Sequence, residues 1–138
     1  MNKFTNIFKD NPLFSDLSVD VVSCTEASLI ISVTELTSKK NELGVVSGSF
    51  ALSFFDTAVG FFIVNKNDAL RSATIFNYNM NIFSPLKGDN FFVEVSQLSH
   101  GTNVCAFQID CYVMRVETKR LLASGQIHAY ISLKKSLK

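Results

Sequence analysis

The stretch that decides the fold is Gly48-Ser-Phe-Ala-Leu-Ser-Phe-Phe-Asp-Thr-Ala-Val-Gly-Phe-Phe-Ile-Val64, which carries a single charged residue, Asp56. A helix that is apolar on nearly every side is normally buried. A carboxylate inside such a helix loses water, so it must be paired, hydrogen-bonded or protonated. Perturbed carboxylates are enriched at functional sites, although structural pairing accounts for others. The stretch therefore predicts a buried central helix, and Asp56 is a candidate for either role.

The chain has 138 residues, a length that predicts one domain over residues 1–138 with room for a real core. Hydrophobic residues make up 47% of it, as in globular proteins, and the net charge of +1 gives no attraction to nucleic acid or an anionic membrane. The apolar stretch is slightly short for a membrane span and has Asp56 near its middle. We therefore expect neither nucleic acid nor a membrane as a partner.

The cysteines and the N-terminus predict a cytoplasmic protein. The chain has three cysteines, an odd number, and none of them shows CxxC spacing: Cys24, Cys105 and Cys111. Cys105 and Cys111 would lie roughly 20 Å apart along one strand, too far for a disulfide. Free thiols indicate a reducing compartment, and the first nine residues lack a signal-peptide hydrophobic region.

Alternating apolar and polar residues predict strands before and after the central helix in the chain. The expected strands cover residues 17–25, 28–36, 74–82, 90–99, 104–116 and 121–133, after a short amphipathic helix over residues 2–9. In the third strand, one predicted face holds Phe76, Tyr78, Met80 and Ile82, and the other holds Asn77, Asn79 and Asn81. This order predicts an α+β fold. Because one sheet covers only one side of a helix, the sheet must wrap around it or a second subunit must close the other side.

The order of motifs resembles the hotdog-fold thioesterases, and especially their phenylacetyl-CoA thioesterase-like (PaaI-like) branch. Members of that branch read approximately Asn-x-x-Gly-x-x-His-Gly-Gly, then an apolar stretch, then Asp-x-Ala-x-Gly. This chain has Asn41-Glu-Leu-Gly-Val-Val-Ser-Gly-Ser49 and then Asp56-Thr-Ala-Val-Gly60. A strand and turn ending in Pro85-Leu-Lys-Gly-Asp89 follow, and 123–130 resembles the last strand of the family. The resemblance covers residues 17–133 and implies a curled antiparallel sheet around one central helix.

The resemblance implies hydrolysis of an acyl-CoA or acyl-carrier thioester without a cofactor or a metal ion. Asp56 would be the general base or the nucleophile, the backbone around Gly48 would bind the oxyanion, and Asn41 would hold water or substrate. The substrate-contacting candidates are Ser47, Ser49 and Asn81. Two positions depart from the family: Ser47 replaces its histidine, and Ser49 replaces its second glycine. Ser47 therefore favours a second hypothesis, a hotdog protein that binds acyl thioesters without hydrolysing them.

Spacing along the helix bears on how such a site is assembled. Asp56 lies eight residues after Gly48, which is about 12 Å along a helix axis. One thioester scarcely reaches both residues within a subunit, so we expect a homodimer with shared sites, with a dimer of dimers as a further option. Asn41 equally suits a loop residue that caps its own backbone. His100 and His128 are expected to be turn and structural residues, which disfavours a third reading, a dehydratase with a histidine base.

Overall fold

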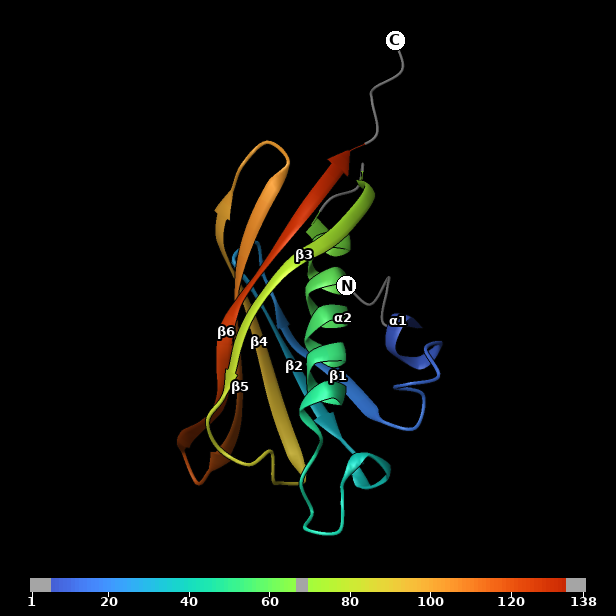
Figure 1. Ribbon diagram of the computed structural model, residues 1–138, viewed down its shortest axis with the longest axis vertical. Coiled ribbons are helices and arrows are strands. Elements are labelled where there is room, and N and C mark those ends of the chain that lie inside the picture. The colour runs from blue at the N-terminus through green and yellow to red at the C-terminus, as the bar shows by residue number, and fades with distance from the viewer. Residues whose placement is uncertain (1–5, 67–69, 134–138) are drawn as a thin grey trace.

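The computed structural model describes residues 6–66 and 70–133, and its elements follow the predicted α+β order (Figure 1). The first part of the predicted helix over 2–9 lies outside the described residues. The elements are α1 Asn6–Lys9, β1 Ser18–Cys24, β2 Ser28–Thr34, a 3-10 turn at Thr37–Lys39, α2 Gly48–Lys66, β3 Leu70–Ile82, β4 Asn90–His100, β5 Val104–Arg115 and β6 Thr118–Leu133.

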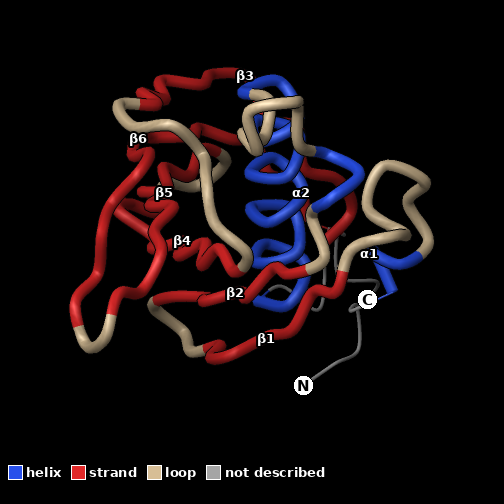
Figure 2. Tube along the Cα trace, turned by 90° about the horizontal axis from the view of Figure 1, so that it is seen from below, coloured by secondary structure: helices blue, strands red, loops and turns tan. Residues whose placement is uncertain are grey.

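The six strands form one antiparallel sheet in the order β1-β2-β4-β5-β6-β3. The sheet curls around α2, as the views along and across the helix show (Figures 1 and 2). β3 follows α2 in sequence but lies at the far edge, where it pairs with β6. The predicted curled sheet around a central helix is therefore confirmed, and its two edge strands are β1 and β3.

Alternate side chains of the central strands bury their apolar surface against α2. Leu29, Ile31 and Val33 of β2 are buried, and so are Phe91, Val93 and Val95 of β4. From the helix, Phe62 meets the ring of Phe107 on β5, with 6.1 Å between the ring centroids. This burial removes nonpolar surface from water, which is the main favourable term in folding. It also explains how a helix long and apolar enough to cross a membrane sits in a protein core.

The N-terminal segment covers a second side of α2. Phe8 lies 5.1 Å from Phe54 and 5.8 Å from Phe61, measured between ring centroids. Phe14 lies 5.6 Å from Phe50 and 5.4 Å from Phe54 in edge-to-face contacts, an arrangement that aromatic rings favour. The sequence suggested only a wrapped sheet or a second subunit to close the helix. In the structure, aromatic side chains of the same chain's N-terminal segment close this side.

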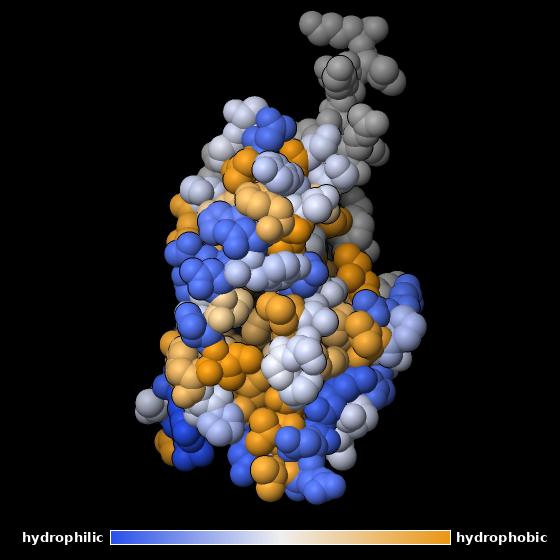
Figure 3. Space-filling model, in the orientation of Figure 1, coloured by the Kyte–Doolittle hydropathy of each residue, from blue (hydrophilic) through white to orange (hydrophobic). Residues whose placement is uncertain are grey.

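A third side of α2 is left open within one chain. It is the side that a second subunit would close in the second arrangement that the sequence allowed. Ser49 and Leu52 are exposed, and Ser53 and Asp56 are half-buried; Leu52 keeps 37% of its surface exposed. Their spacing places them on one helix face, which we call the open stripe. β3 lies beside α2 (Figure 1), and hydrophobic surface gathers in the lower half of the face that these two elements present (Figure 3).

A β-bulge in β3 corrects the predicted grouping of its side chains. The register with β6 shifts between Ile75 and Asn77, so Phe76 is the extra residue. The ring of Phe76 stacks on Tyr130, with centroids 4.2 Å apart, whereas Ile75 packs against the core. Bulges reorient side chains in this way. The alternation alone placed Phe76 on the same face of the strand as Tyr78. The bulge instead turns Phe76 to the opposite face.

The three cysteines are free thiols, as the spacing predicted. Cys105 and Cys111 are buried, and Cys24 is half-buried. Burial raises the pKa of Cys111 to about 12, because an apolar environment disfavours the thiolate. Cys111 therefore stays protonated at neutral pH and behaves as a small hydrophobic side chain.

Candidate active site

The carboxylate of Asp56 is held by a residue that sequence reasoning missed. Tyr78 on β3 donates its hydroxyl to Asp56 Oδ2 at 2.8 Å. Burial first, and then the hydrogen bond and the negative charge of Asp56, raise the pKa of Tyr78 to about 12. Asp56 is half-buried, and this hydrogen bond is one of the compensations expected for its carboxylate. The available signal was a tyrosine on the helix-facing side of a strand, because a tyrosine hydroxyl usually needs a partner.

The N-terminus of α2 lies two turns away and presents backbone donors. Phe50 donates its N–H to Ser47 Oγ at 3.2 Å, and Ala51 donates to the Ser47 carbonyl at 3.1 Å. Ser47 is thus the N-cap of α2. The N–H groups of Gly48 and Ser49 have no hydrogen-bond acceptor among the described residues. Of the backbone around Gly48, the amides of Gly48 and Ser49 are therefore the donors without an acceptor, and that of Phe50 is engaged.

Gly48 sits against the end of β3. A Cβ added there would lie 3.2 Å from Cδ1 of Ile82, a tight contact next to the helix N-terminus. α2 and β3 thus run in opposite directions, with Gly48 beside Ile82 and Asp56 beside Tyr78. Gly48 and Ser49 are exposed, so their amides are open to an incoming carbonyl oxygen.

The side chain of Asn41 shapes the loop that leads into α2. Its Oδ1 accepts the N–H groups of Leu43 at 2.9 Å and Val45 at 3.1 Å. Val46 then donates its N–H to the carbonyl of Leu86 at 3.0 Å, which ties this loop to the turn before β4. These contacts are those of the loop-capping role, one of the two roles that the sequence left open for Asn41.

The two remaining predicted residues lie in different places. Ser49 is exposed in the first turn of α2, with its Oγ 3.4 Å from Ser47 Oγ. Asn81 pairs in register with Ser124 and lines an open surface groove of about 660 Å³. By strand alternation, it faces away from Tyr78 and Asp56. The structure therefore brings Ser47, Gly48 and Ser49 together and leaves Asn81 apart from them within one chain.

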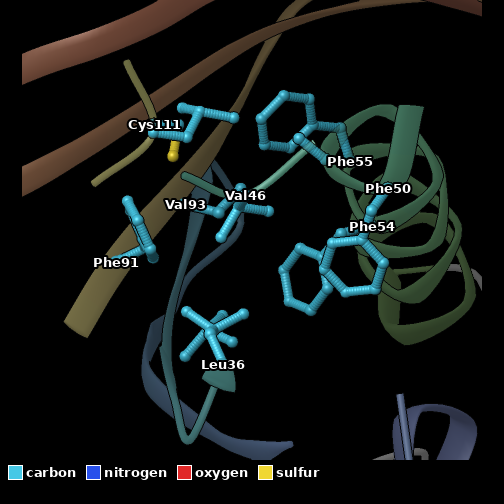
Figure 4. A pocket seen from close by; sticks show the side chains of 11 residues that line it. Leu36, Val46, Phe50, Phe54, Phe55, Phe91, Val93 and Cys111 are labelled. Atoms are coloured by element: carbon cyan, nitrogen blue, oxygen red, sulfur yellow. The ribbon is translucent and has the colours of Figure 1, made fainter. Parts of the chain in front are cut away.

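A small apolar cavity adjoins the helix N-terminus (Figure 4). Its volume is about 30 Å³. Phe50, Phe54 and Phe55 approach it from α2, while Phe91, Val93 and Cys111 line the strand side. Val33, Leu36, Val46, Ala51 and Leu86 complete a wholly nonpolar lining. Because Phe50 and Ala51 belong to the first turn of α2, an acyl group at that turn would meet this lining.

The described histidine and acidic side chains form no second centre near Asp56. Among residues 6–66 and 70–133, no three His, Cys, Asp or Glu side chains gather to hold a metal ion. His128 lies beside Phe76, with 6.1 Å between ring centroids, and its buried Nδ1 has no hydrogen-bond partner. The side chain of His100 lies outside the described residues. The chemistry available around α2 is thus that of a carboxylate, a tyrosine hydroxyl and backbone amides.

No protein-family model and no curated protein matches the sequence, but solved structures match its fold. A thioesterase family protein from Silicibacter pomeroyi aligns with a TM-score of 0.77 at 12% identity, covering 94% of this chain and 98% of that one. A hypothetical thioesterase from Streptococcus pneumoniae, solved with coenzyme A, has a TM-score of 0.71 at 13% identity over 86% and 89%. A Streptococcus mutans protein bound to acetyl-CoA has a TM-score of 0.70 at 15% identity over 86% and 92%.

These alignments span most of each chain, so the likeness is not confined to a short shared substructure. At such identities, it is the path of the backbone that is shared. The central helix, the short N-terminal helix and the curled six-stranded sheet observed here match that path. The chain therefore has the hotdog fold, the fold of these thioesterase structures.

Proposed function

We propose that this protein hydrolyses an acyl-CoA thioester to a free acid and a thiol. The observation that carries the proposal is the Asp56 carboxylate, hydrogen-bonded by Tyr78 and placed on the open stripe of a helix whose first amides lack acceptors among the described residues. Structures of the same fold with coenzyme A or acetyl-CoA support the choice of acyl-CoA. The PaaI-like branch remains the model for the site, with Asp56, Gly48 and Asn41 at the matching positions.

The chemistry follows from charge that develops on the thioester oxygen. The carbonyl oxygen would lie at the N–H groups of Gly48 and Ser49, where the helix N-terminus stabilises negative charge. Asp56 would either take a proton from the attacking water or attack the carbonyl carbon itself. Collapse of the tetrahedral intermediate then breaks the C–S bond and releases the thiolate of coenzyme A. In the first route, the proton taken by Asp56 passes to this thiolate. In the second, water hydrolyses the aspartyl anhydride that remains and supplies the proton. Both routes thus end in the free acid and the thiol.

Assembly of the site requires a second copy of the chain. Asp56 lies about 12 Å beyond Gly48 along the same helix, so one thioester does not reach both within a subunit. A two-fold axis near the open stripe would place Asp56 of one subunit opposite Gly48 of the other. β3 is an edge strand, and Tyr78 and Ile82 on it leave 39% and 45% of their surfaces exposed; such edges readily pair. We therefore include a homodimer in the proposal, with pairing into a tetramer as an option.

The apolar cavity is the proposed start of the acyl site. It adjoins the first turn of α2, on the side where the acyl chain of a carbonyl held by Gly48 would enter. At about 30 Å³, the cavity is small, and we propose that a long acyl chain widens it. Phe50 lines the cavity and is half-buried. Longer acyl chains would require the Phe50 ring to move.

The alternative is a protein that binds acyl thioesters without turnover. Ser47 favours it, because a serine is short and cannot be a cation, whereas the family's histidine can. In the structure, Ser47 Oγ also accepts the Phe50 N–H, so its lone pairs are partly engaged in capping the helix. The alternative predicts binding of acyl-CoA with thiol release no faster than in buffer.

Thiol release from a panel of acyl-CoAs, with equilibrium binding measured on the same protein, separates the two hypotheses. We expect Asp56→Asn to lower hydrolysis at least about 100-fold, as for a lost acid–base group, while the fold and the binding survive. Unchanged turnover by a folded Asp56→Asn protein would remove Asp56 from the mechanism. Wild-type binding without turnover would select the alternative.

The shared site has its own test in mixed dimers. Asp56→Asn chains are combined with Gly48→Val chains, each nearly inactive alone. If each site takes Asp56 from one subunit and Gly48 from the other, a heterodimer regains about one good site of its two. A stable, active monomer in sedimentation experiments would contradict this arrangement.

A further inference from the structure

We infer that Tyr78 is a positioning residue that orients the Asp56 carboxylate and leaves Oδ1 as its reacting oxygen. The inference rests on the proposed thioester hydrolysis and concerns a residue that the motif resemblance does not include. Its basis is a single contact: the Tyr78 hydroxyl donates to Asp56 Oδ2 at 2.8 Å. Because α2 and β3 are both rigid elements, this contact fixes the side chain from outside its own helix.

The contact assigns different tasks to the two carboxylate oxygens. Oδ2 accepts the tyrosine hydroxyl, whereas Oδ1 of Asp56 has no hydrogen-bond donor among the described residues. Asp56 lies on the open stripe and is half-buried, so water and substrate approach it from that side. Oδ1 is thus the oxygen available to meet them.

The hydrogen bond persists through either chemical route. If Asp56 is the base, Oδ1 takes a proton from water, and Oδ2 becomes the carbonyl oxygen of a carboxylic acid, which still accepts from Tyr78. If Asp56 is the nucleophile, Oδ1 forms the new bond to the acyl carbon as the C–S bond breaks. Oδ2 is then the aspartyl carbonyl oxygen of a mixed anhydride, and the same hydroxyl polarises it towards attack by water. In both routes the tyrosine keeps its proton.

The state of the tyrosine agrees with this role. Burial and the neighbouring carboxylate raise the pKa of Tyr78 to about 12, so its hydroxyl remains a donor at every pH at which a thioesterase assay is practical. A donor that is always protonated gives Asp56 one fixed partner. Orientation of this kind lowers the entropy that must be lost on reaching the transition state.

The test is Tyr78→Phe, which removes the hydroxyl and keeps the ring. We expect kcat for acyl-CoA hydrolysis to fall about 10-fold, the order for a hydrogen bond to a charged group, with KM changed less than about 2-fold. The matched control is Tyr130→Phe, because Tyr130 stacks on Phe76 on the other face of the sheet. That control should retain the wild-type kcat.

A double-mutant cycle distinguishes positioning from a general structural effect. If Tyr78 acts through Asp56, adding Tyr78→Phe to Asp56→Asn should lower the residual rate by less than about 2-fold. An equal loss in both backgrounds would contradict the inference, and so would a Tyr78→Phe enzyme as fast as wild type. Wild-type protein without turnover would instead overturn the proposed function, and the positioning role with it.

Discussion

Gly48 faces Ile82 where α2 begins and β3 ends: a methyl group at Gly48 would lie 3.2 Å from Ile82 Cδ1. Such a contact would be tighter than ordinary van der Waals spacing, yet 45% of the surface of Ile82 is exposed. Ile82 can therefore yield to a small group at Gly48 but not to a branched one. The start of the central helix is thus bounded by an edge strand as well as by its own cap.

This contact predicts that Gly48→Val lowers thioester hydrolysis at least about 100-fold, the order for a lost oxyanion donor. The branched side chain would push the first turn of α2 away from Ile82 and displace the amides. Adding Ile82→Ala to Gly48→Val should raise the rate of hydrolysis about 10-fold, because it removes the obstructing atom. Kinetics with one acyl-CoA and thermal melting of the three variants are the measurements. Equal rates for Gly48→Val with and without Ile82→Ala would show that the steric account is wrong.

Ser47 as the N-cap of α2 predicts a stability effect separate from catalysis. Ser47→Ala should lower the free energy of unfolding by about 1 kcal/mol, because Phe50 loses its acceptor, and should cost less activity than Asp56→Asn. Ser47→Asp is the matched control, since aspartate caps equally well. Ser47→His should leave hydrolysis unchanged or raise it by restoring the family residue. Collapse of vigorous hydrolysis in Ser47→Ala would place the centre of the chemistry at Ser47.

The proposed two-fold axis predicts which residue of α2 meets its own copy. Leu52 lies midway between Gly48 and Asp56 in sequence and is exposed on the open stripe. If Asp56 of each subunit lies opposite Gly48 of the other, the midpoint between them lies at the two-fold axis. Leu52 of both subunits is then at that axis. Leu52→Cys should therefore give a covalent dimer on mild oxidation or with a short bismaleimide. Val22→Cys, exposed on the opposite edge strand, serves as the control and should stay monomeric on denaturing gels.

The raised pKa of Tyr78 predicts a specific loss of stability in alkali. Its pKa is about 12 in the folded protein and 10 in the reference state, so folding favours the protonated hydroxyl. The resulting stabilisation is complete below pH 10 and declines between pH 10 and 12. Denaturant unfolding across this range should show a steeper decline for wild type than for Tyr78→Phe. Parallel curves for the two proteins would indicate that the hydroxyl titrates normally.

Much of the fold could be predicted because its elements carry strong local patterns. Period-two alternation marked the strands of the sheet, and the unbroken apolar stretch marked the core helix. The shielding of α2 by Phe8 and Phe14 could not be predicted, because it depends on how a distant segment packs. The bulge at Phe76 was equally hidden, since one extra residue breaks an alternation that otherwise reads as regular.

The candidate site shows the same difference between local patterns and contacts between distant segments. Asp56, Gly48 and Ser47 lie within one helix and its cap, so sequence order alone placed them relative to one another. Tyr78 joins Asp56 through the packing of β3 on α2, and 22 residues separate the pair in the chain. Asn81 was grouped with them by motif, but strand alternation turns it to the other face. Local spacing thus identified the carboxylate and the amides, whereas the contact between elements required the structure.

The position of β3 has a consequence for the newly synthesised chain. Among the described residues, its partner in the sheet is β6, which follows β4 and β5 in the chain. While β4 and β5 emerge from the ribosome, β3 has no neighbour, and its backbone donors and acceptors remain unpaired. Long-range pairing of this kind is slow and exposes aggregation-prone edges. We therefore expect truncation within β6 to produce insoluble protein, and nascent chains arrested before β6 to recruit chaperones that recognise extended apolar segments.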